Sequence, residues 1–179
     1  MSILAVVDMQ PGYSASKACL ANVIELVAKS MRHSLPILVI ELNPESCKET
    51  YPEITDLLKG YRKYSKITKI SDDGSLEFKD FIESDPLGQK VNLDKIRVCG
   101  VNANCCVRAT ALGLDKKYEQ SKIIVHYEAC CGTSGNMNQS FRDNDWHWFV
   151  RSNDQKNLFI CKEGRIYHPL HKSIQVGAA

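Results

Sequence analysis

Short apolar runs alternate with longer stretches of helical periodicity along this chain of 179 residues. The first run, from Ile3 to Val7, is uniformly apolar, which is typical of a strand buried on both faces of a sheet. Apolar residues then recur at i, i+3, i+4, i+7 and i+11 from Leu20, and this spacing predicts a helix over residues 16–33. By the same criteria, strands are predicted at residues 3–8, 37–42, 64–70, 95–101, 122–127 and 158–161, and further helices at 76–82, at 105–118 and in a short segment from Pro52.

This alternation predicts an α/β protein with a three-layer αβα, Rossmann-like fold and a central, mainly parallel six-stranded sheet. Residues 64–70 alternate polar and apolar side chains, so this strand should lie near a sheet edge. Residues 136–150 are a further helix candidate, although their apolar positions form no single stripe. A chain of this length is expected to form one domain, over residues 1–179, around a single core.

The composition is that of an ordinary globular protein, with 44% hydrophobic residues, 25% charged residues and a formal net charge of +2. This balance gives no electrostatic reason to expect a nucleic acid or an anionic membrane as a partner. The N-terminal residues lack the basic flank and cleavage site of a secretory signal, and no stretch is apolar enough for a membrane span. We therefore predict a cytoplasmic protein whose eight cysteines are reduced.

Three reactive side chains fall at the carboxyl ends of predicted strands. Asp8 ends the first strand, Lys69 lies toward the end of the third with Lys66 as the alternative, and Cys106 lies just beyond the fourth. Ligands of open parallel sheets bind in the crevice outside the carboxyl ends of the strands. The sequence therefore predicts that a carboxylate, a cation and a thiol converge on one crevice.

Cys106 is preceded by a second cysteine, Cys105, at the start of a predicted helix. Asn104 is a suitable N-cap residue, which would place both thiols in the first helical turn. Free backbone N–H groups and the positive end of the helix dipole lower the pKa of a thiol there. Since successive helical residues differ by about 100° around the axis, only one thiol should face the crevice. The six other cysteines are predicted to be structural, and the histidines show no metal-ligand spacing.

Two stretches of the chain resemble the isochorismatase-like cysteine hydrolases, a superfamily that includes nicotinamidases and N-carbamoyl amide hydrolases. The stretch VVDMQ at residues 6–10, with Tyr13 five positions after Asp8, is similar to the family's opening strand, which ends in D-x-Q. The stretch GVNANCCVRATA at residues 100–111 is similar to the signature G-V-A-T-D-x-C-V-x-x-T-A. The chain departs from that signature at residues 102–104, where N-A-N replaces A-T-D, so that a carboxylate of the family becomes the neutral amide of Asn104.

The resemblance implies a catalytic triad with Cys106 as the nucleophile, Asp8 as the base and Lys69 as the lysine, with Lys66 as the alternative. It also implies an oxyanion hole made by the backbone N–H groups of Asn102 and Cys106, aimed by a cis peptide bond between Val101 and Asn102. Metal-binding nicotinamidases carry D-x-H after the second strand, whereas residues 41–44 here read ELNP. We therefore expect no cofactor and no catalytic metal. Dimers and larger assemblies are common in the family, which implies a homo-oligomer.

These observations lead to the hypothesis of a metal-free hydrolase that cleaves a small amide or related C–N bond through a thioester on Cys106. One alternative is a hydrolase of the same fold that acts on a vinyl ether, as isochorismatases do. Another is a catalytically silent binding or scaffold protein, which the altered turn at residues 102–104 favours and the retention of three reactive strand-end residues opposes. A nucleotide-binding Rossmann protein is less favoured, because no G-x-G-x-x-G follows the first strand.

Overall fold

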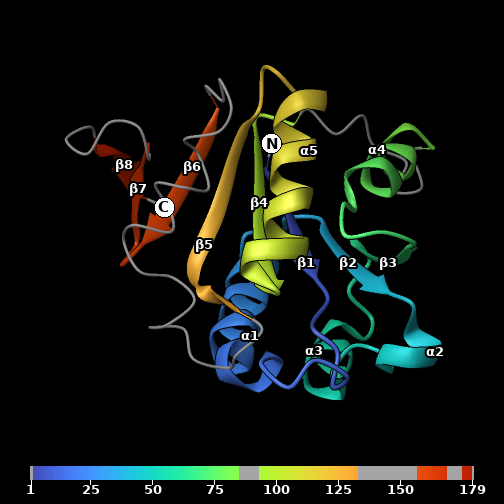
Figure 1. Cartoon of the computed structure of the whole chain (residues 1–179). Coiled ribbons are helices and arrows are strands. Elements are labelled where there is room, and N and C mark those ends of the chain that lie inside the picture. The colour runs from blue at the N-terminus through green and yellow to red at the C-terminus, as the bar shows by residue number, and fades with distance from the viewer. Residues whose placement is uncertain (1, 85–92, 133–156, 169–174, 179) are drawn as a thin grey trace.

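The computed structural model of the chain describes residues 2–84, 93–132, 157–168 and 175–178. Fourteen elements follow one another in these ranges (Figure 1). They are β1 (Ser2–Val7), α1 (Ser16–Arg32), β2 (Ile37–Leu42), α2 (Pro44–Cys47), α3 (Pro52–Leu58), β3 (Tyr64–Lys69), α4 (Ser75–Glu83), β4 (Lys95–Val101), the π-helical turn η1 (Ala103–Val107), α5 (Arg108–Lys117), β5 (Lys122–Cys131), β6 (Leu158–Lys162), β7 (Arg165–Tyr167) and β8 (Gln175–Ala178).

The strands form one sheet in the order β3-β2-β1-β4-β5-β6-β7-β8. The first six strands in this order are parallel, which confirms the predicted α/β fold. Strands β7 and β8 extend the sheet antiparallel beyond β6 and are absent from the prediction. The signal for β7 is a two-residue turn, since Glu163 and Gly164 have φ angles of 51° and 72°, as in the tight turns that join antiparallel strands.

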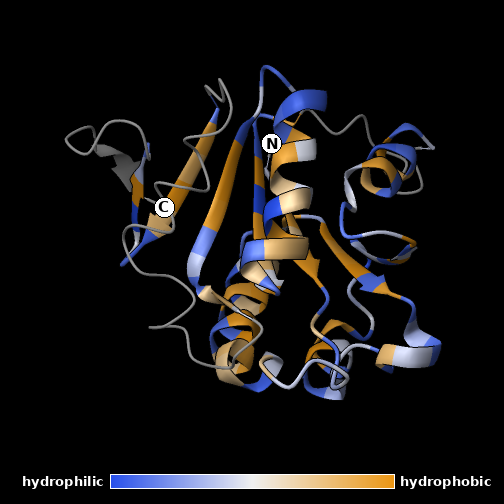
Figure 2. Cartoon of the chain, in the orientation of Figure 1, coloured by the Kyte–Doolittle hydropathy of each residue, from blue (hydrophilic) through white to orange (hydrophobic). Residues whose placement is uncertain are grey.

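Helices cover both faces of the sheet. The crossovers through α1 and α5 leave the middle of the sheet in opposite directions, so right-handed connections place these two helices on opposite faces. α1 packs against β4 and β5, whereas α5 packs against β5 and β6 and contacts α4. Figure 2 shows the apolar strands running through the middle of the molecule, with the polar residues of the helices outside. None of the described helices is long and apolar enough to cross a membrane.

Most predicted boundaries agree with the structure to within one or two residues, and β3 lies at the sheet edge as its alternating pattern indicates. Two predictions were wrong. The helix expected at 105–118 is divided into η1 and α5, and the strand expected at 122–127 continues to Cys131. β5 reaches this length because its pairing with β4 shifts register between Val98 and Gly100. The helix candidate at 136–150 lies outside the described residues.

β1 and β4 lie side by side at the point where the strand order reverses, which is where open parallel sheets bind ligands. Gly100 of β4 pairs in register with Val7 of β1 and has a φ angle of 136°. A Cβ atom at Gly100 would overlap the carbonyl oxygen of Val7. Glycine is therefore required here for the two strands to approach each other.

We expect Gly100→Ala to lower the free energy of unfolding by about 3 kcal/mol or more, because it adds backbone strain to a collision with β1. Gly60→Ala is the matched control, since Gly60 has a φ angle of 80° but no atom within 4 Å of an added Cβ. It should lose only about 1 kcal/mol. Urea denaturation of both variants measures the difference, and equal losses would contradict the close-approach argument.

Candidate active site

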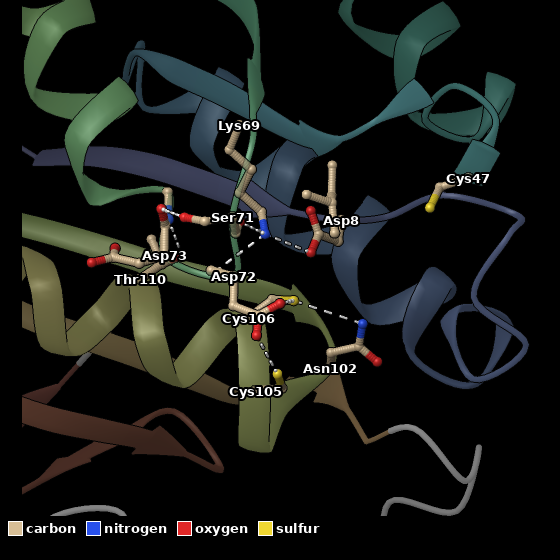
Figure 3. Close-up of polar contacts among 12 residues, drawn as sticks. Asp8, Cys47, Lys69, Ser71, Asp72, Asp73, Asn102, Cys105, Cys106 and Thr110 are labelled. Carbon is tan, nitrogen blue, oxygen red and sulfur yellow. Dashed lines mark hydrogen bonds and ion pairs between the residues drawn. The ribbon is translucent and has the colours of Figure 1, made fainter. Parts of the chain in front are cut away.

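The carboxyl ends of β1, β3 and β4 bring three reactive side chains together at the point where the strand order reverses (Figure 3). Asp8 follows β1, Lys69 is the last residue of β3, and Cys106 lies in η1 directly after β4. Their exposed fractions are 0%, 0% and 2%. The structure therefore brings the three residues that the sequence singles out into one buried group.

Asp8 and Lys69 form a fully buried ion pair, with 3.1 Å between Lys69 Nζ and Asp8 Oδ2. Lys69 Nζ also donates to the carbonyl oxygens of Ser71 at 2.9 Å and Asp72 at 3.2 Å. Lys69 Nζ thus has two hydrogen-bond acceptors and one ion-pair partner, Asp8 Oδ2, which makes no hydrogen bond of its own. A buried ammonium group requires such polar and charged partners in place of water.

Lys66, the alternative lysine, lies in a different environment. Its Nζ is 3.4 Å from Glu41 Oε2 and 3.3 Å from Glu49 Oε2, and its side chain is 34% exposed. These two acidic partners hold Lys66 away from Asp8, so Lys69 is the lysine that the structure places in the group.

Burial raises the pKa of the Asp8 carboxyl above its ordinary value, while the neighbouring charge of Lys69 acts in the opposite direction. The nearby Cys106 thiol also acts to lower this pKa, although its hydrogen bond goes to Asp72. A carboxylate whose pKa is raised in this way is a stronger base than a solvated one, so Asp8 is suited to accept a proton from a neighbouring thiol.

Burial and the negative charge of Asp8 raise the pKa of the Cys106 thiol well above its usual range, and Lys69 only partly opposes this. The expectation that a helix N-terminus lowers this pKa is therefore wrong. Two backbone N–H groups of the turn, those of Cys105 and Val107, donate to the carbonyl oxygen of Asn102 at 2.8 and 3.2 Å. At rest Cys106 is consequently a neutral thiol.

The turn before Cys106 also differs from the prediction. Asn102, not Asn104, precedes the helical turn, and its side chain makes no capping hydrogen bond. The described residues contain no cis peptide bond, so the expected cis bond between Val101 and Asn102 is absent. The chain instead turns through the left-handed conformation of Asn102, with φ 57° and ψ 53°. The side-chain amide of Asn102 donates to Cys106 Sγ at 3.8 Å.

Asp72, which the sequence analysis missed, bridges the two adjacent cysteines. Cys106 Sγ donates to Asp72 Oδ1 at 3.5 Å, and Cys105 Sγ donates to Asp72 Oδ2 at 3.2 Å. Although both thiols contact Asp72, Cys105 is exposed and only Cys106 is buried together with Asp8 and Lys69, as expected for one thiol facing the crevice. Asp72 lies three positions after Lys69, beyond the carboxyl end of β3, and that position was the signal available in the sequence.

Contacts with α5 fix the loop that carries Asp72 (Figure 3). The backbone N–H of Gly74 donates to Thr110 Oγ1 at 3.0 Å, and that of Ser75 donates to Asp73 Oδ1 at 2.8 Å. A side chain at Gly113 would collide with Ser75 and Asp73. Because α5 continues directly from η1, which carries Cys105 and Cys106, these contacts fix the position of Asp72 relative to the two thiols.

Gln10, the last residue of the D-x-Q motif, has a structural position. It is fully buried, its Nε2 donates to the carbonyl oxygen of Leu42 at 3.1 Å, and its Oε1 accepts from the N–H of Leu42 at 3.0 Å. Gln10 therefore pairs with the end of β2 like a strand backbone. This pairing fixes the path of the chain just after Asp8.

The described residues contain one group of side chains that could hold a metal ion. Ligand atoms of Asp72, Cys105 and Cys106 all lie within 4.8 Å of one another. Segment 41–44 is engaged elsewhere, since Glu41 is buried, accepts from the N–H of Thr50 at 2.6 Å and pairs with Lys66. A thiophilic metal ion bound by the first group would occupy the Cys106 thiol itself.

Comparisons with known proteins give a sequence relative and neighbours of the same fold. No protein-family model matches the chain. Isochorismatase domain-containing protein 2 of Xenopus laevis is 28% identical over 141 residues, which cover 74% of this chain and 62% of that protein, so the match spans less than two thirds of its length.

Two solved structures show the same fold. The nicotinamidase SaPncA of Staphylococcus aureus superimposes with a TM-score of 0.63 and 15% identity, covering 77% of this chain and 88% of that one. The YcaC protein of Escherichia coli, described as an octameric hydrolase of unknown specificity, superimposes with a TM-score of 0.64 and 17% identity, covering 88% and 74%.

We expect Lys69→Met to lower the free energy of unfolding by about 3–5 kcal/mol at neutral pH, because it leaves the buried Asp8 carboxylate without a cation. Lys66→Met, at a partly exposed pair, should cost less than about 1 kcal/mol. The loss in Lys69→Met should shrink as the pH falls, because Asp8 then takes up a proton and no longer needs the cation. Denaturation from pH 5 to pH 8 tests both, and a pH-independent loss would contradict the ion-pair argument.

Proposed function

Because the chain resembles the isochorismatase-like hydrolases in sequence and has their fold, we propose that it is a cysteine hydrolase of small amides or related C–N bonds. In this proposal Cys106 is the nucleophile, Asp8 the acid and base, and Lys69 the cation that keeps Asp8 ionised. The reaction passes through a thioester and uses no metal ion.

The observation that carries the proposal is the buried Asp8–Lys69 ion pair beside the Cys106 thiol. A fully desolvated pair of charges is costly to maintain, and a scaffold would gain nothing by keeping it next to a cysteine. Ionisable groups whose pKa values are shifted in this way are concentrated at catalytic and binding sites. The amidase activity in the name of the S. aureus relative supports the choice of C–N bonds.

The first step follows from the protonation states at rest. Cys106 is a neutral thiol, and its Sγ becomes nucleophilic as Asp8 accepts the proton during attack on the substrate carbonyl. Lys69 makes this transfer possible, because burial alone would favour a protonated Asp8 that could not act as a base. The nucleophile is thus activated only when a substrate is in place.

The remaining steps return the proton and break the thioester. The backbone N–H groups of Asn102 and Cys106 are the proposed donors to the tetrahedral oxyanion. Asp8 gives its proton to the departing amine, which leaves the acyl group on Cys106 Sγ. The same carboxylate then takes a proton from water, whose oxygen attacks the thioester carbonyl. The C–S bond breaks, the acid is released, and Asp8 returns the proton to Cys106 Sγ.

Asp72 favours neutral or cationic substrates over anionic ones. Within the described ranges, its carboxylate oxygens receive hydrogen bonds from the two thiols and lie in no ion pair. A substrate that reaches Cys106 therefore lies close to the Asp72 carboxylate, whereas the charge of Lys69 is paired with Asp8. Isochorismate is a dicarboxylate, so the charge of Asp72 opposes the vinyl-ether alternative and favours uncharged amides.

We also propose that the chain forms a homo-oligomer, as its resemblance to the isochorismatase-like hydrolases implies. The description of the E. coli YcaC protein as octameric supports this proposal.

Cys106→Ala should lower turnover of any active small amide by at least about 10³-fold, since it removes the attacking atom. Cys105→Ala is the matched control, with an adjacent thiol that also contacts Asp72 and an expected change of less than roughly threefold. Mass spectrometry of the intact wild-type protein, quenched in acid after incubation with a panel of amides, should show an acyl adduct on Cys106. Loss of turnover in Cys105→Ala with retention in Cys106→Ala would show that the wrong thiol is assigned.

Asp72→Asn should raise kcat/KM for a substrate carrying a carboxylate by about tenfold relative to its uncharged amide analogue, because a like charge within a few ångströms is removed. The uncharged analogue serves as the internal control and should change little. Steady-state kinetics with matched substrate pairs at low and high salt measure the effect, which should be smaller at high salt. An unchanged ratio would show that Asp72 does not select substrates by charge.

A further inference from the structure

Two buried thiols outside the candidate active site lie in contact with each other. Cys19 is in the first turn of α1 and Cys131 is the last residue of β5, and both are fully buried. Their Sγ atoms are 2.8 Å apart. This distance lies between the bond length of a disulfide, about 2.05 Å, and the ordinary contact distance of two sulfur atoms.

Hydrogen bonds on both sides of the thiol pair already dock α1 on β5. Asn22 Nδ2, one helical turn after Cys19, donates to the carbonyl oxygen of Glu128 at 2.6 Å. Cys131 Sγ donates to the carbonyl oxygen of Ala15, just before α1, at 2.9 Å. The two sulfur atoms need to approach by only about 0.75 Å to reach bonding distance, which small side-chain rotations can supply while the helix stays in place.

The two thiols are chemically unequal. The two sulfur atoms share a hydrogen bond in which either can be the donor, and this contact lowers the pKa of Cys131 and raises that of Cys19. Burial raises the pKa of Cys130, the sequence neighbour of Cys131, well above its usual range. Since the thiolate is the reactive form, Cys131 is the thiol of the pair that reacts more readily with an oxidant.

We propose that Cys19 and Cys131 form a reversible disulfide that ties the start of α1 to the end of β5. With hydrogen peroxide as the oxidant, Cys131 Sγ attacks one peroxide oxygen, the O–O bond breaks, and Cys131 becomes a sulfenic acid with release of hydroxide. Cys19 Sγ then attacks the sulfur of Cys131 and expels its oxygen. Together with the two thiol protons, the peroxide leaves as two water molecules, and the two thiols have lost two electrons.

The cross-link braces both chain segments that lead into the candidate active site. Cys131 pairs in register with Val101, the residue before the Asn102 turn. Cys19 Sγ lies 3.8 Å from Sδ of Met9, the residue after Asp8. The bond would therefore stiffen the approach to Asp8 and to Cys106 while using neither of them, and its formation does not depend on the proposed catalytic function.

Peptide mapping of the full chain tests the proposal. The wild-type protein is treated with hydrogen peroxide, denatured in the presence of N-ethylmaleimide and digested. We expect one linked peptide that joins Cys19 to Cys131, is about 2 Da lighter than the two free peptides together, and separates again with dithiothreitol. The oxidised protein should also melt roughly 10 °C above the reduced one, because the bond closes a loop of more than a hundred residues.

Two variants give the matched comparison. Cys131→Ala should lose both the linked peptide and the oxidation-dependent rise in Tm, whereas Cys130→Ala, at the adjacent buried thiol, should keep both. Wild-type protein in which Cys19 and Cys131 both remain free to react with N-ethylmaleimide after peroxide treatment would overturn the proposal. A linked peptide that joins either Cys19 or Cys131 to a different cysteine would also overturn the proposal. Both of these outcomes are measured on the wild-type protein alone.

Discussion

The ion pair between Lys69 and Asp8 is the interaction on which this end of the molecule depends. Both groups are fully buried, so neither can be charged without the other. Lys69 lies on the edge strand β3 and Asp8 follows β1, with β2 between them. The pair therefore fixes the relative positions of three strands. The remaining N–H donors of Lys69 bind the carbonyl oxygens of Ser71 and Asp72, so the same cation also sets the path of the loop that reaches the cysteines.

The ion pair also determines where the proton lies before a reaction. Burial raises the pKa values of Asp8 and Cys106 together, and the positive charge of Lys69 opposes both shifts. Beside this cation, only one of these two acidic groups carries a negative charge at rest. Asp8 holds that charge because it is in direct contact with Lys69, and Cys106 keeps its proton. In such a site Cys106 is not a thiolate before a substrate binds, so it is less prone to oxidation than a thiolate would be.

The sequence was sufficient to predict the fold and to place Asp8, Cys106 and a lysine, either Lys69 or Lys66, near strand ends, because these depend on periodicity and on where strands end. The apolar run of β1 identifies Asp8 as a strand-end residue, and the signature at residues 100–111 identifies Cys106. The geometry of the turn could not be predicted in this way. Whether Asn102 or Asn104 begins the helical turn depends on backbone angles that similar side chains do not distinguish. Asp72 escaped notice because its role arises from packing against α5, a contact between distant parts of the chain.

One departure of the chain from its relatives is compensated by another. The family signature carries a carboxylate at the position of Asn104, where this chain has a neutral amide. Asp72 brings a carboxylate to the same two cysteines from the opposite side, from the loop after β3. Because Thr110 and Gly113 of α5 hold that loop, the charge is positioned by the helix that follows Cys106. The carboxylate beside the two cysteines thus comes from the loop after β3 and not from the turn that carries them.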